Sequence, residues 1–192
     1  MPLAPYKLLR FDPIFNGLRD DAISEVITAP IRKSMLPQVL APGEPIESAI
    51  RDLNAPAALH NFGMPSACQT YADAVLQSLQ EALKMHFSSQ GLAVHVTSPA
   101  HQDTVQLNQN STFHLLKDRV HLLLPIFANA CTIVFEQVDP LLMRLLEHAA
   151  EWRPDEVLCL QSDIGFSVPG GNIRFVLSDY PISQNSSNAA TT

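Results

Sequence analysis

The sequence predicts an α+β fold: a single domain in which a mainly antiparallel sheet is packed by two amphipathic helices and follows a proline-rich N-terminal arm. Apolar residues recur at helical spacing in segments 71–90 and 140–152. Short apolar runs typical of strands lie between and after them, and eight of the fifteen prolines fall within the first 56 residues. We therefore divide the chain into an arm at 1–65, a core domain at 66–182 and a flexible polar tail at 183–192.

The arm is expected to hold only short elements, because each proline removes a backbone donor and biases the preceding residue toward extended geometry. We expect a strand at 6–11 and helices near 20–28 and 45–53. A dense apolar set without helical or strand periodicity also lies here: Leu8, Leu9, Phe11, Ile14 and Phe15. Exposed apolar patches mark interfaces, so these are candidate binding residues, and packing on the chain's own sheet is the alternative.

Segment 71–90 has the strongest helical pattern in the chain. Its apolar face carries Ala72, Val75, Leu76, Leu79, Ala82, Leu83 and Phe87. Charged and amide side chains lie on the opposite face. Thr70 and Asp73 form a capping pattern at the start, and Gly91 is a natural stop.

Strand patterns follow this helix. They fall at 92–96, 104–107, 112–116, 119–126, 131–137, 156–161, 164–168 and 172–177. Pro169-Gly170-Gly171 predicts a hairpin turn between the last two, since glycine accepts positive φ angles.

Segment 140–152 is predicted as the second helix. Asp139 followed by Pro140 is a helix-start pattern, because proline is favoured at the first helical position. Leucine and alanine residues then form an apolar stripe that ends at Trp152, and Pro154 limits the helix.

Composition excludes several classes of protein. Only 16% of the 192 residues are charged, against about 25% on average, and the net charge is -7. This excludes a coiled coil and a charge-driven disordered chain, and without a Lys/Arg cluster we expect no nucleic-acid partner. We find neither a membrane-spanning stretch nor a secretory leader. Three widely spaced cysteines favour buried thiols and a cytoplasmic location.

Histidine offers a candidate metal site. His95 and His101 flank a proline, and Asp103 follows closely, so a bend would bring together three side chains of the types that bind zinc or iron. The alternative is solvated loop histidines, since this spacing matches no established metal motif, and we expect no cofactor. His114 and His121 are a second possible pair, if their segments form a hairpin.

Nucleophilic catalysis has one candidate. Cys68 lies just before the first helix, where the helix N-terminus lowers a thiol pKa, and His60 is a possible base. The alternative is a small apolar residue packed at the helix entrance. Nucleotide-binding glycine motifs are absent from the sequence.

These observations favour a non-enzymatic protein–protein interaction or assembly subunit, with a protein partner or self-association. The alternative is a small hydrolase-like enzyme that uses Cys68 or the His95, His101 and Asp103 cluster. The order helix, strands, helix, strands between residues 71 and 180, with acidic charge, is also similar to class I secretion chaperones, although this chain lacks their C-terminal helix and adds the arm. The resemblance implies a dimer whose groove binds extended polypeptide by strand addition.

Overall fold

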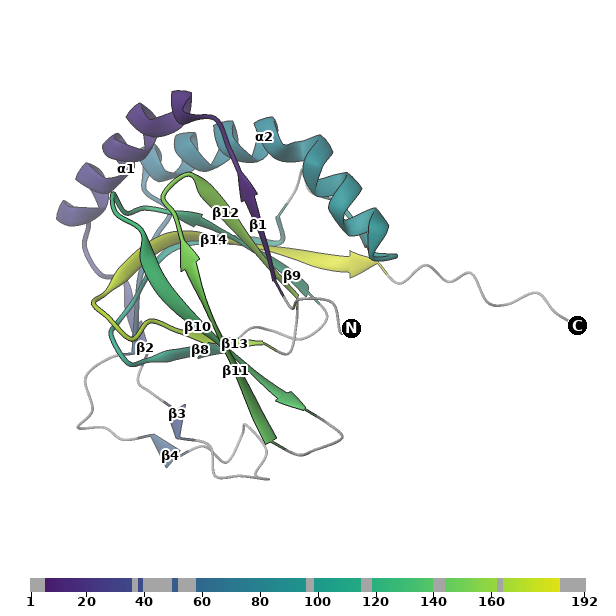
Figure 1. Ribbon diagram of the computed structural model, residues 1–192. Coiled ribbons are helices and arrows are strands. Elements are labelled where there is room, and N and C mark those ends of the chain that lie inside the picture. Colours follow the sequence, from purple (N-terminus) through teal and green to yellow (C-terminus); the bar gives the residue numbers. More distant parts are fainter. Residues whose placement is uncertain are drawn as a thin grey trace, which may run out of the picture.

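Two α-helices and two facing antiparallel sheets form most of the described part of the chain (Figure 1). This computed structural model describes residues 6–35, 38–39, 50–51, 58–95, 99–114, 119–139, 144–161 and 164–183. The helices are α1 (Asn16–Thr28), which follows the short 3-10 helix η1 (Pro13–Phe15), and α2 (Ser66–Ser89).

The larger sheet has the strand order β1-β12-β9-β14-β7-β5-β2, with β6 paired to β14. Its strands are β1 (Tyr6–Arg10), β2 (Lys33–Met35), β5 (Leu59–Gly63), β6 (Ala93–Val94), β7 (His101–Leu107), β9 (Arg119–Pro125), β12 (Glu156–Gln161) and β14 (Ile173–Ser183). The smaller sheet has the order β11-β10-β13-β8. Its strands are β8 (Thr112–His114), β10 (Cys131–Asp139), β11 (Arg144–Trp152) and β13 (Gly165–Ser167). The short strands β3 (Gln38–Val39) and β4 (Ile50–Arg51) pair with each other.

Strands β7 to β14 are shared between the two sheets in a jelly-roll order. The larger sheet contains β7, β14, β9 and β12 side by side, and the smaller sheet contains β8, β13, β10 and β11. Every pairing among the described strands is antiparallel. Two facing antiparallel sheets with this connectivity form a jelly roll. The prediction of a mainly antiparallel α+β chain is confirmed at this level.

Aromatic side chains fill the space between the two sheets. Tyr6 stacks on Phe135 with 4.1 Å between ring centroids, and Trp152 meets Phe127 edge-on at 5.0 Å. The Trp152 indole also donates a hydrogen bond to the carbonyl of Glu156 at 2.8 Å, so its polar atom is satisfied. The same core contains Leu107, Leu123, Leu158, Leu160, Phe166 and Phe175.

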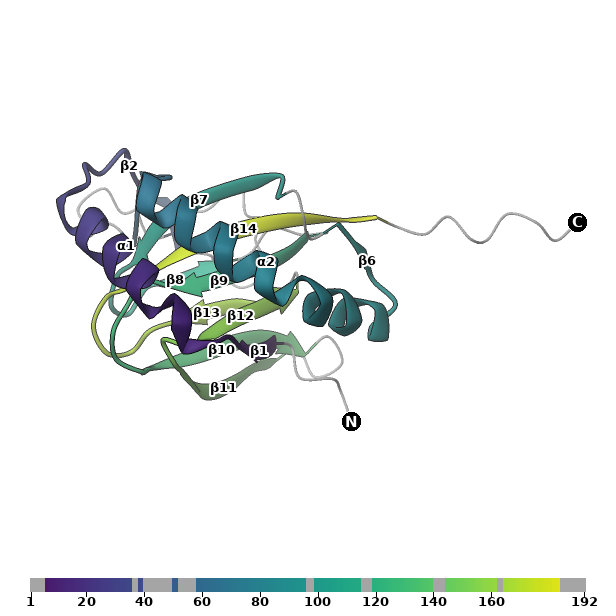
Figure 2. The ribbon, with the colours of Figure 1, turned by 90° about the horizontal axis from the view of Figure 1, so that it is seen from above.

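The two helices cover the outer face of the larger sheet (Figures 1 and 2). The apolar face predicted for 71–90 is the buried face of α2, and its residues pack with outward-facing residues of β9 and β14. Helix α1 adds Ala22 and Val26 to this second core. The prediction of an amphipathic helix at 71–90 is confirmed, with an earlier start at Ser66.

The N-terminus of α2 is capped by a residue distant in the sequence. The carboxylate of Glu25 in α1 accepts hydrogen bonds from the amide of Ala67 at 2.6 Å and from the hydroxyl of Ser66 at 3.0 Å. A carboxylate at this position satisfies a free amide and interacts favourably with the helix dipole. At the other end, Gly91 has a φ of +71°, as a glycine stop predicts.

The predicted helix at 140–152 is wrong. Residues 144–152 form β11, which pairs along its whole length with β10, from Cys131 opposite Trp152 to Asp139 opposite Arg144. Among the β11 residues whose burial is described, burial alternates only at the end of the strand, where Ala150 is half-buried, Glu151 is exposed and Trp152 is buried. A nine-residue antiparallel partner therefore overrides the helical preference of a Leu-, Ala- and Glu-rich segment.

The N-terminal arm forms integral elements of this fold. The strand expected at 6–11 is β1, which pairs with β12, and the helix expected near 20–28 is α1. Strand β5 (Leu59–Gly63) pairs with β7. Most of the helix expected at 45–53 and nearly all of the tail at 183–192 lie outside the described residues. No helix in the described part of the chain is both long and apolar enough to span a membrane.

Candidate functional site

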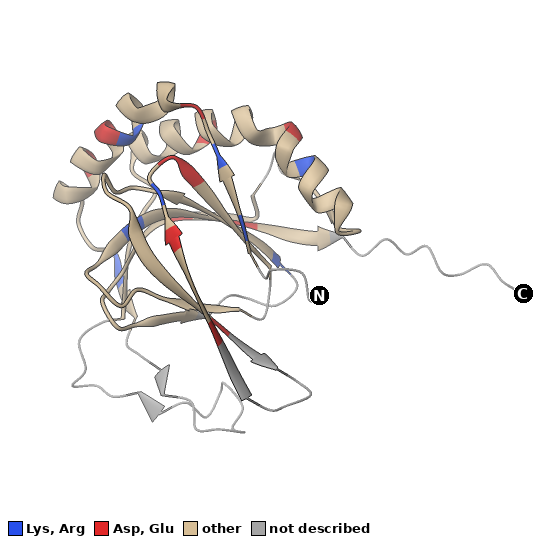
Figure 3. Ribbon diagram, viewed as in Figure 1, with Lys and Arg blue, Asp and Glu red and all other residues tan. Residues whose placement is uncertain are grey.

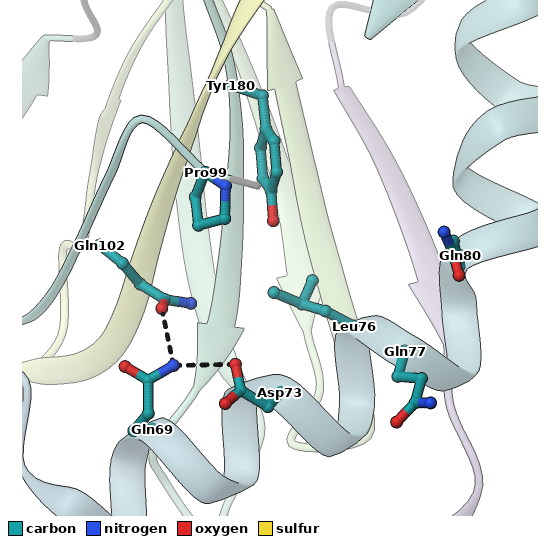
Figure 4. Close-up of a pocket in the computed structure, with 8 residues that line it drawn as sticks. All are labelled: Gln69, Asp73, Leu76, Gln77, Gln80, Pro99, Gln102 and Tyr180. Carbon is teal, nitrogen blue, oxygen red and sulfur yellow. Dashed lines mark hydrogen bonds between the residues drawn. The ribbon is translucent and has the colours of Figure 1, made fainter. Parts of the chain in front are cut away.

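A cavity of about 340 Å³ lies where α2 passes over the edge of β7 and the end of β14 (Figure 4). Helix α2 supplies one wall, and the chain around β7 and β14 supplies the other. We call it the α2 pocket. The lining residues are Gln69, Asp73, Leu76, Gln77, Gln80, Pro99, Gln102 and Tyr180.

Helical spacing places the α2 residues on one side of the pocket. Most spacings between the five α2 lining positions are three, four, seven or eight residues, so these positions share one face of the helix. They are positions 69, 73, 76, 77 and 80. Gln102 lies in β7 and Tyr180 in β14, and the adjacent residues on each strand face the space between the two sheets. Because successive side chains of a strand point to opposite faces, Gln102 and Tyr180 point to the helix side of the larger sheet. The pocket thus depends on α2 and on the outer face of two strands.

A chain of hydrogen bonds joins the two walls. The amide nitrogen Nε2 of Gln69 donates to Asp73 Oδ1 at 2.8 Å and to Gln102 Oε1 at 3.1 Å (Figure 4). Gln102 Nε2 in turn donates to the hydroxyl of Ser178 at 2.8 Å. Because Gln69 Nε2 donates to both neighbours and Gln102 is hydrogen-bonded through both of its amide atoms, the bridge fixes the position of the Asp73 carboxylate at the rim.

Tyr180 is the buried polar group of the pocket. Its side chain is fully buried, its hydroxyl end points toward α2, and its hydroxyl oxygen has no hydrogen-bond partner (Figure 4). Burial, and to a smaller extent the negative charge of Asp73, raise the pKa of the Tyr180 phenol above its ordinary value. The phenol is therefore a neutral donor, and buried donors without a partner are rare in folded proteins.

The electrostatic character of the pocket follows from its lining. Asp73 is the single charged residue among the described lining residues, and neither lysine nor arginine is one of them. Charged residues are sparse over most of the ribbon (Figure 3). Amide groups both donate and accept, and the phenol donates. The lining suits an uncharged polar molecule and disfavours an anion, which would meet the Asp73 carboxylate without a compensating cation.

The structure brings two of the three predicted metal-binding residues together. His101 Nε2 lies 2.6 Å from Asp103 Oδ2, which also accepts a hydrogen bond from Asn61 Nδ2 at 2.6 Å. His95 is exposed and lies after β6. Across the described ranges, no group of three or more His, Cys, Asp or Glu side chains is arranged to hold a metal ion.

The second histidine pair is separated by the sheet topology. His114 ends β8 in the smaller sheet, whereas His121 lies in β9 of the larger sheet, so the expected hairpin does not form. His121 instead lies 2.6 Å from Asp179 of β14, through its Nδ1 atom, and both side chains are buried. This pair links two adjacent strands inside the sandwich.

The environment of Cys68 is that of a core residue. Its side chain is fully buried, and its thiol faces the carbonyl of Ala22 at 3.9 Å. Burial raises the pKa of the Cys68 thiol to about 11, opposite to the shift that nucleophilic activation requires. His60 lies in β5, where its Nδ1 atom is 2.9 Å from the hydroxyl of Ser34. The two candidate catalytic residues thus have different partners.

The apolar residues of the arm pack within the chain. Phe11 is buried in the core under the helices, and Leu9 and Phe15 pack against that core. Leu8 packs against the other core, between the two sheets. Ile14 is the exception, with 78% of its surface exposed. Four of the five predicted binding residues therefore stabilise the fold itself.

Sequence reasoning missed the α2 pocket. It placed Asp73, Gln77 and Gln80 on a helix face directed to water, and Tyr180 lay beyond the last predicted strand. The one feature of the sequence that could have indicated the pocket is the concentration of glutamine on the polar face of α2, where charged residues are more usual. Which strands lie beneath α2 was not visible in the sequence.

Comparison with solved structures shows a shared fold. The chain is similar to SnoN, a non-heme alpha-ketoglutarate-dependent epimerase from nogalamycin biosynthesis, with a TM-score of 0.55 and 6% identity over 92% of this chain and 76% of that one. It is also similar to SnoK, a non-heme alpha-ketoglutarate-dependent carbocyclase from the same biosynthesis, with a TM-score of 0.51 and 9% identity over 92% and 79% of the chains. No protein-family model and no curated protein sequence matches the chain.

These findings overturn the predicted function. A non-enzymatic interaction or assembly subunit is contradicted, because the fold is shared with enzymes and the apolar arm residues on which the prediction depended are packed inside the chain. The secretion-chaperone alternative fails as well, since the second helix that its element order requires is strand β11.

Proposed function

We propose that this chain binds an uncharged, polar small molecule in the α2 pocket, as the substrate site of a jelly-roll enzyme. The observation that carries the proposal is the Tyr180 hydroxyl, a buried donor without a partner at the inner end of a cavity. An unpaired buried donor costs about 1–3 kcal/mol, and a ligand that accepts its hydrogen bond removes this cost.

The volume and lining support a small ligand. About 340 Å³ lies at the lower end of the range of roughly 300–1,000 Å³ found for ligand pockets. Asp73 and Tyr180 are a carboxylate and a phenol, the types of group that accept and donate protons in general acid–base catalysis. The enzyme part of the proposal is supported by the fold shared with SnoN and SnoK.

The metal and the cosubstrate implied by those enzymes were tested against this chain's residues. His101 and Asp103 are two donors of suitable type, but the described residues provide no third donor beside them, and Asp103 Oδ2 is already engaged by Asn61. The α2 pocket lacks the cationic side chain that would pair with a dicarboxylate such as alpha-ketoglutarate. The described residues therefore do not fit the metal, the α2 pocket does not fit alpha-ketoglutarate, and we assign the α2 pocket to an uncharged substrate.

A thermal-shift screen tests this function. The purified chain is measured with uncharged polar compounds (hexoses, hexitols, small amides) and with alpha-ketoglutarate in the presence and absence of Fe²⁺ or Ni²⁺. We expect a rise in Tm with at least one uncharged class, because a ligand that binds only the folded state stabilises it in proportion to its occupancy. A variant in which Gln77 and Gln80 are both replaced by alanine is expected to lose the shift.

Two results would contradict the proposal. One is a Tm rise with alpha-ketoglutarate and metal that the Gln77 and Gln80 substitutions leave unchanged, because the substrate site would then lie elsewhere. The other is the absence of any shift with uncharged compounds at millimolar concentration. Glu81→Gln is the matched control, since Glu81 is an exposed residue of α2 that pairs with Lys84 and does not line the pocket.

A further inference from the structure

We propose that the α2 pocket holds a ligand hydroxyl between the Tyr180 phenol and the Asp73 carboxylate, so that the ligand is a polyhydroxylated molecule of monosaccharide size. This inference rests on the proposed function and specifies the substrate class of the same pocket. The class includes cyclic hexoses and open-chain hexitols, which present the same chemistry.

The two protein groups are complementary to a hydroxyl. Tyr180 offers a donor without an acceptor, and Asp73 is an acceptor whose Oδ1 atom already receives one hydrogen bond from Gln69. A carboxylate has about four acceptor positions, so capacity remains for a further donor. The charge of Asp73 raises the pKa of Tyr180, so the two groups interact electrostatically across the pocket.

Several common ligand groups satisfy only one of these partners. A carbonyl accepts from Tyr180 but offers nothing to Asp73, and an ammonium group donates to Asp73 but cannot accept from Tyr180. A ligand carboxylate would be repelled by Asp73. A hydroxyl accepts from the phenol and donates to the carboxylate through a single oxygen atom, whereas an amide needs two different atoms to do so. We therefore assign a hydroxyl to this position, and the binding of small amides is the competing outcome in the experiment below.

The rest of the lining extends this match along a carbon skeleton. Gln77 and Gln80 come from successive turns of α2, and each amide donates and accepts. Leu76 and Pro99 provide apolar surface for C–H groups. A compact skeleton with a hydroxyl on most carbons meets both kinds of surface, whereas an apolar ligand would leave the amides and the carboxylate unpaired.

Entry to Tyr180 requires a side-chain movement. The hydroxyl oxygen is buried, and Gln102, which lines the same pocket, is held in place by its hydrogen bonds with Gln69 and Ser178. We infer that the ligand replaces the Gln69–Gln102 hydrogen bond when it binds. The ligand would then hydrogen-bond to the amides of Gln69 and Gln102 in place of their bond to each other, and it would also supply an acceptor for the Tyr180 hydroxyl.

Isothermal titration calorimetry with D-glucose, D-galactose, D-mannose and sorbitol tests the inference. Tyr180→Phe and Asp73→Asn are each expected to weaken binding of the best ligand by roughly tenfold, because the first removes the donor and the second replaces the charged acceptor with a neutral amide. Tyr71→Phe and Glu81→Gln are the matched controls, and we expect both to bind within about twofold of the unmodified chain. Tyr71 is a buried α2 tyrosine whose hydroxyl bonds to the Pro125 carbonyl, away from the lining.

Monodeoxy derivatives of the best ligand then identify the hydroxyl. For the unmodified chain, one derivative is expected to bind roughly tenfold more weakly than the parent ligand. For Tyr180→Phe, the same derivative and the parent ligand are expected to bind equally well, because the substitution has already removed the interaction that the missing hydroxyl would make. Equal losses for every derivative in both proteins would overturn the inference.

The outcome also separates this inference from the proposed function. If small amides bind with a dependence on Gln77 and Gln80 while no hexose or hexitol binds, the proposed function stands and the hydroxyl site is overturned. If no uncharged compound binds, the proposed function itself fails. Preference for a hexose over sorbitol, or the reverse, assigns the cyclic or the open-chain form.

Discussion

Tyr180 and Tyr71 give opposite predictions for the same substitution, tyrosine to phenylalanine. Both side chains are fully buried, and burial raises the pKa of both phenols, so each hydroxyl is a neutral donor. The Tyr71 hydroxyl donates to the Pro125 carbonyl at 3.1 Å, whereas the Tyr180 hydroxyl has no partner. The substitution thus removes a satisfied group at one site and an unsatisfied group at the other.

The expected magnitudes follow from these partners. A satisfied hydrogen bond contributes about 1 kcal/mol net, so Tyr71→Phe is expected to lower the free energy of unfolding by about 1–2 kcal/mol. An unpaired buried hydroxyl costs about 1–3 kcal/mol, so Tyr180→Phe is expected to raise the free energy of unfolding by about 1 kcal/mol. For a domain of this length, about 1 kcal/mol corresponds to about 2–4 °C in Tm.

Urea denaturation followed by circular dichroism measures both variants against the unmodified chain. Similar m values for all three proteins are required, so that a change in midpoint reports stability. If Tyr180→Phe is destabilised as much as Tyr71→Phe, the Tyr180 hydroxyl has a partner inside the protein. The observation that carries the proposed function would then be lost.

Three further predictions concern the rest of the molecule. Burial, and to a smaller extent the positive charge of Lys7, lowers the pKa of His86. Neutral His86 therefore contributes to stability above about pH 6.5, and this contribution is lost as the pH falls. Between about pH 7.5 and pH 5.5 the unmodified chain should lose more stability than the His86→Gln variant, and equal losses would contradict this prediction. Burial raises the pKa of the Cys68 and Cys159 thiols, so both should react slowly with Ellman's reagent at about pH 7.5 and rapidly in denaturant. Because Cys131 is only partly buried, rapid labelling of more than one thiol in the native protein would refute the assigned burial. Trp152→Ala should cost about 3–5 kcal/mol by urea denaturation, because a fully buried indole between the sheets is removed, and a loss below about 1 kcal/mol would place Trp152 outside the core.

The fold was predictable where local pattern and tertiary packing agree. The apolar face of 71–90 is the buried face of α2, and most strand patterns coincide with strands of the jelly roll. At 144–152 the local pattern and the tertiary packing disagree. Leucine, alanine and glutamate favour a helix there, but β10 offers a complete antiparallel partner and Trp152 has a place in the inner core.

The candidate site was less predictable than the fold. His101 and Asp103 were expected to meet together with His95 through a bend, whereas their contact in the structure comes from their positions two residues apart on one strand. Gln69 and Tyr180 are far apart in the sequence, and they line one pocket because α2 crosses the outer face of β14. No local pattern records which strand lies beneath a helix.

Local sequence pattern was enough to predict the mainly antiparallel class, the long amphipathic helix and the positions of the apolar strands, because these depend on the spacing of apolar side chains along a few residues. Long-range contacts set the division of the strands between two sheets, the strand at 144–152, the Glu25 cap on α2 and the pocket that ends at Tyr180. Each of these depends on contacts between residues far apart in the chain. The energy of such contacts, from buried area and from paired polar groups, exceeds local conformational preferences of a few tenths of a kcal/mol per residue.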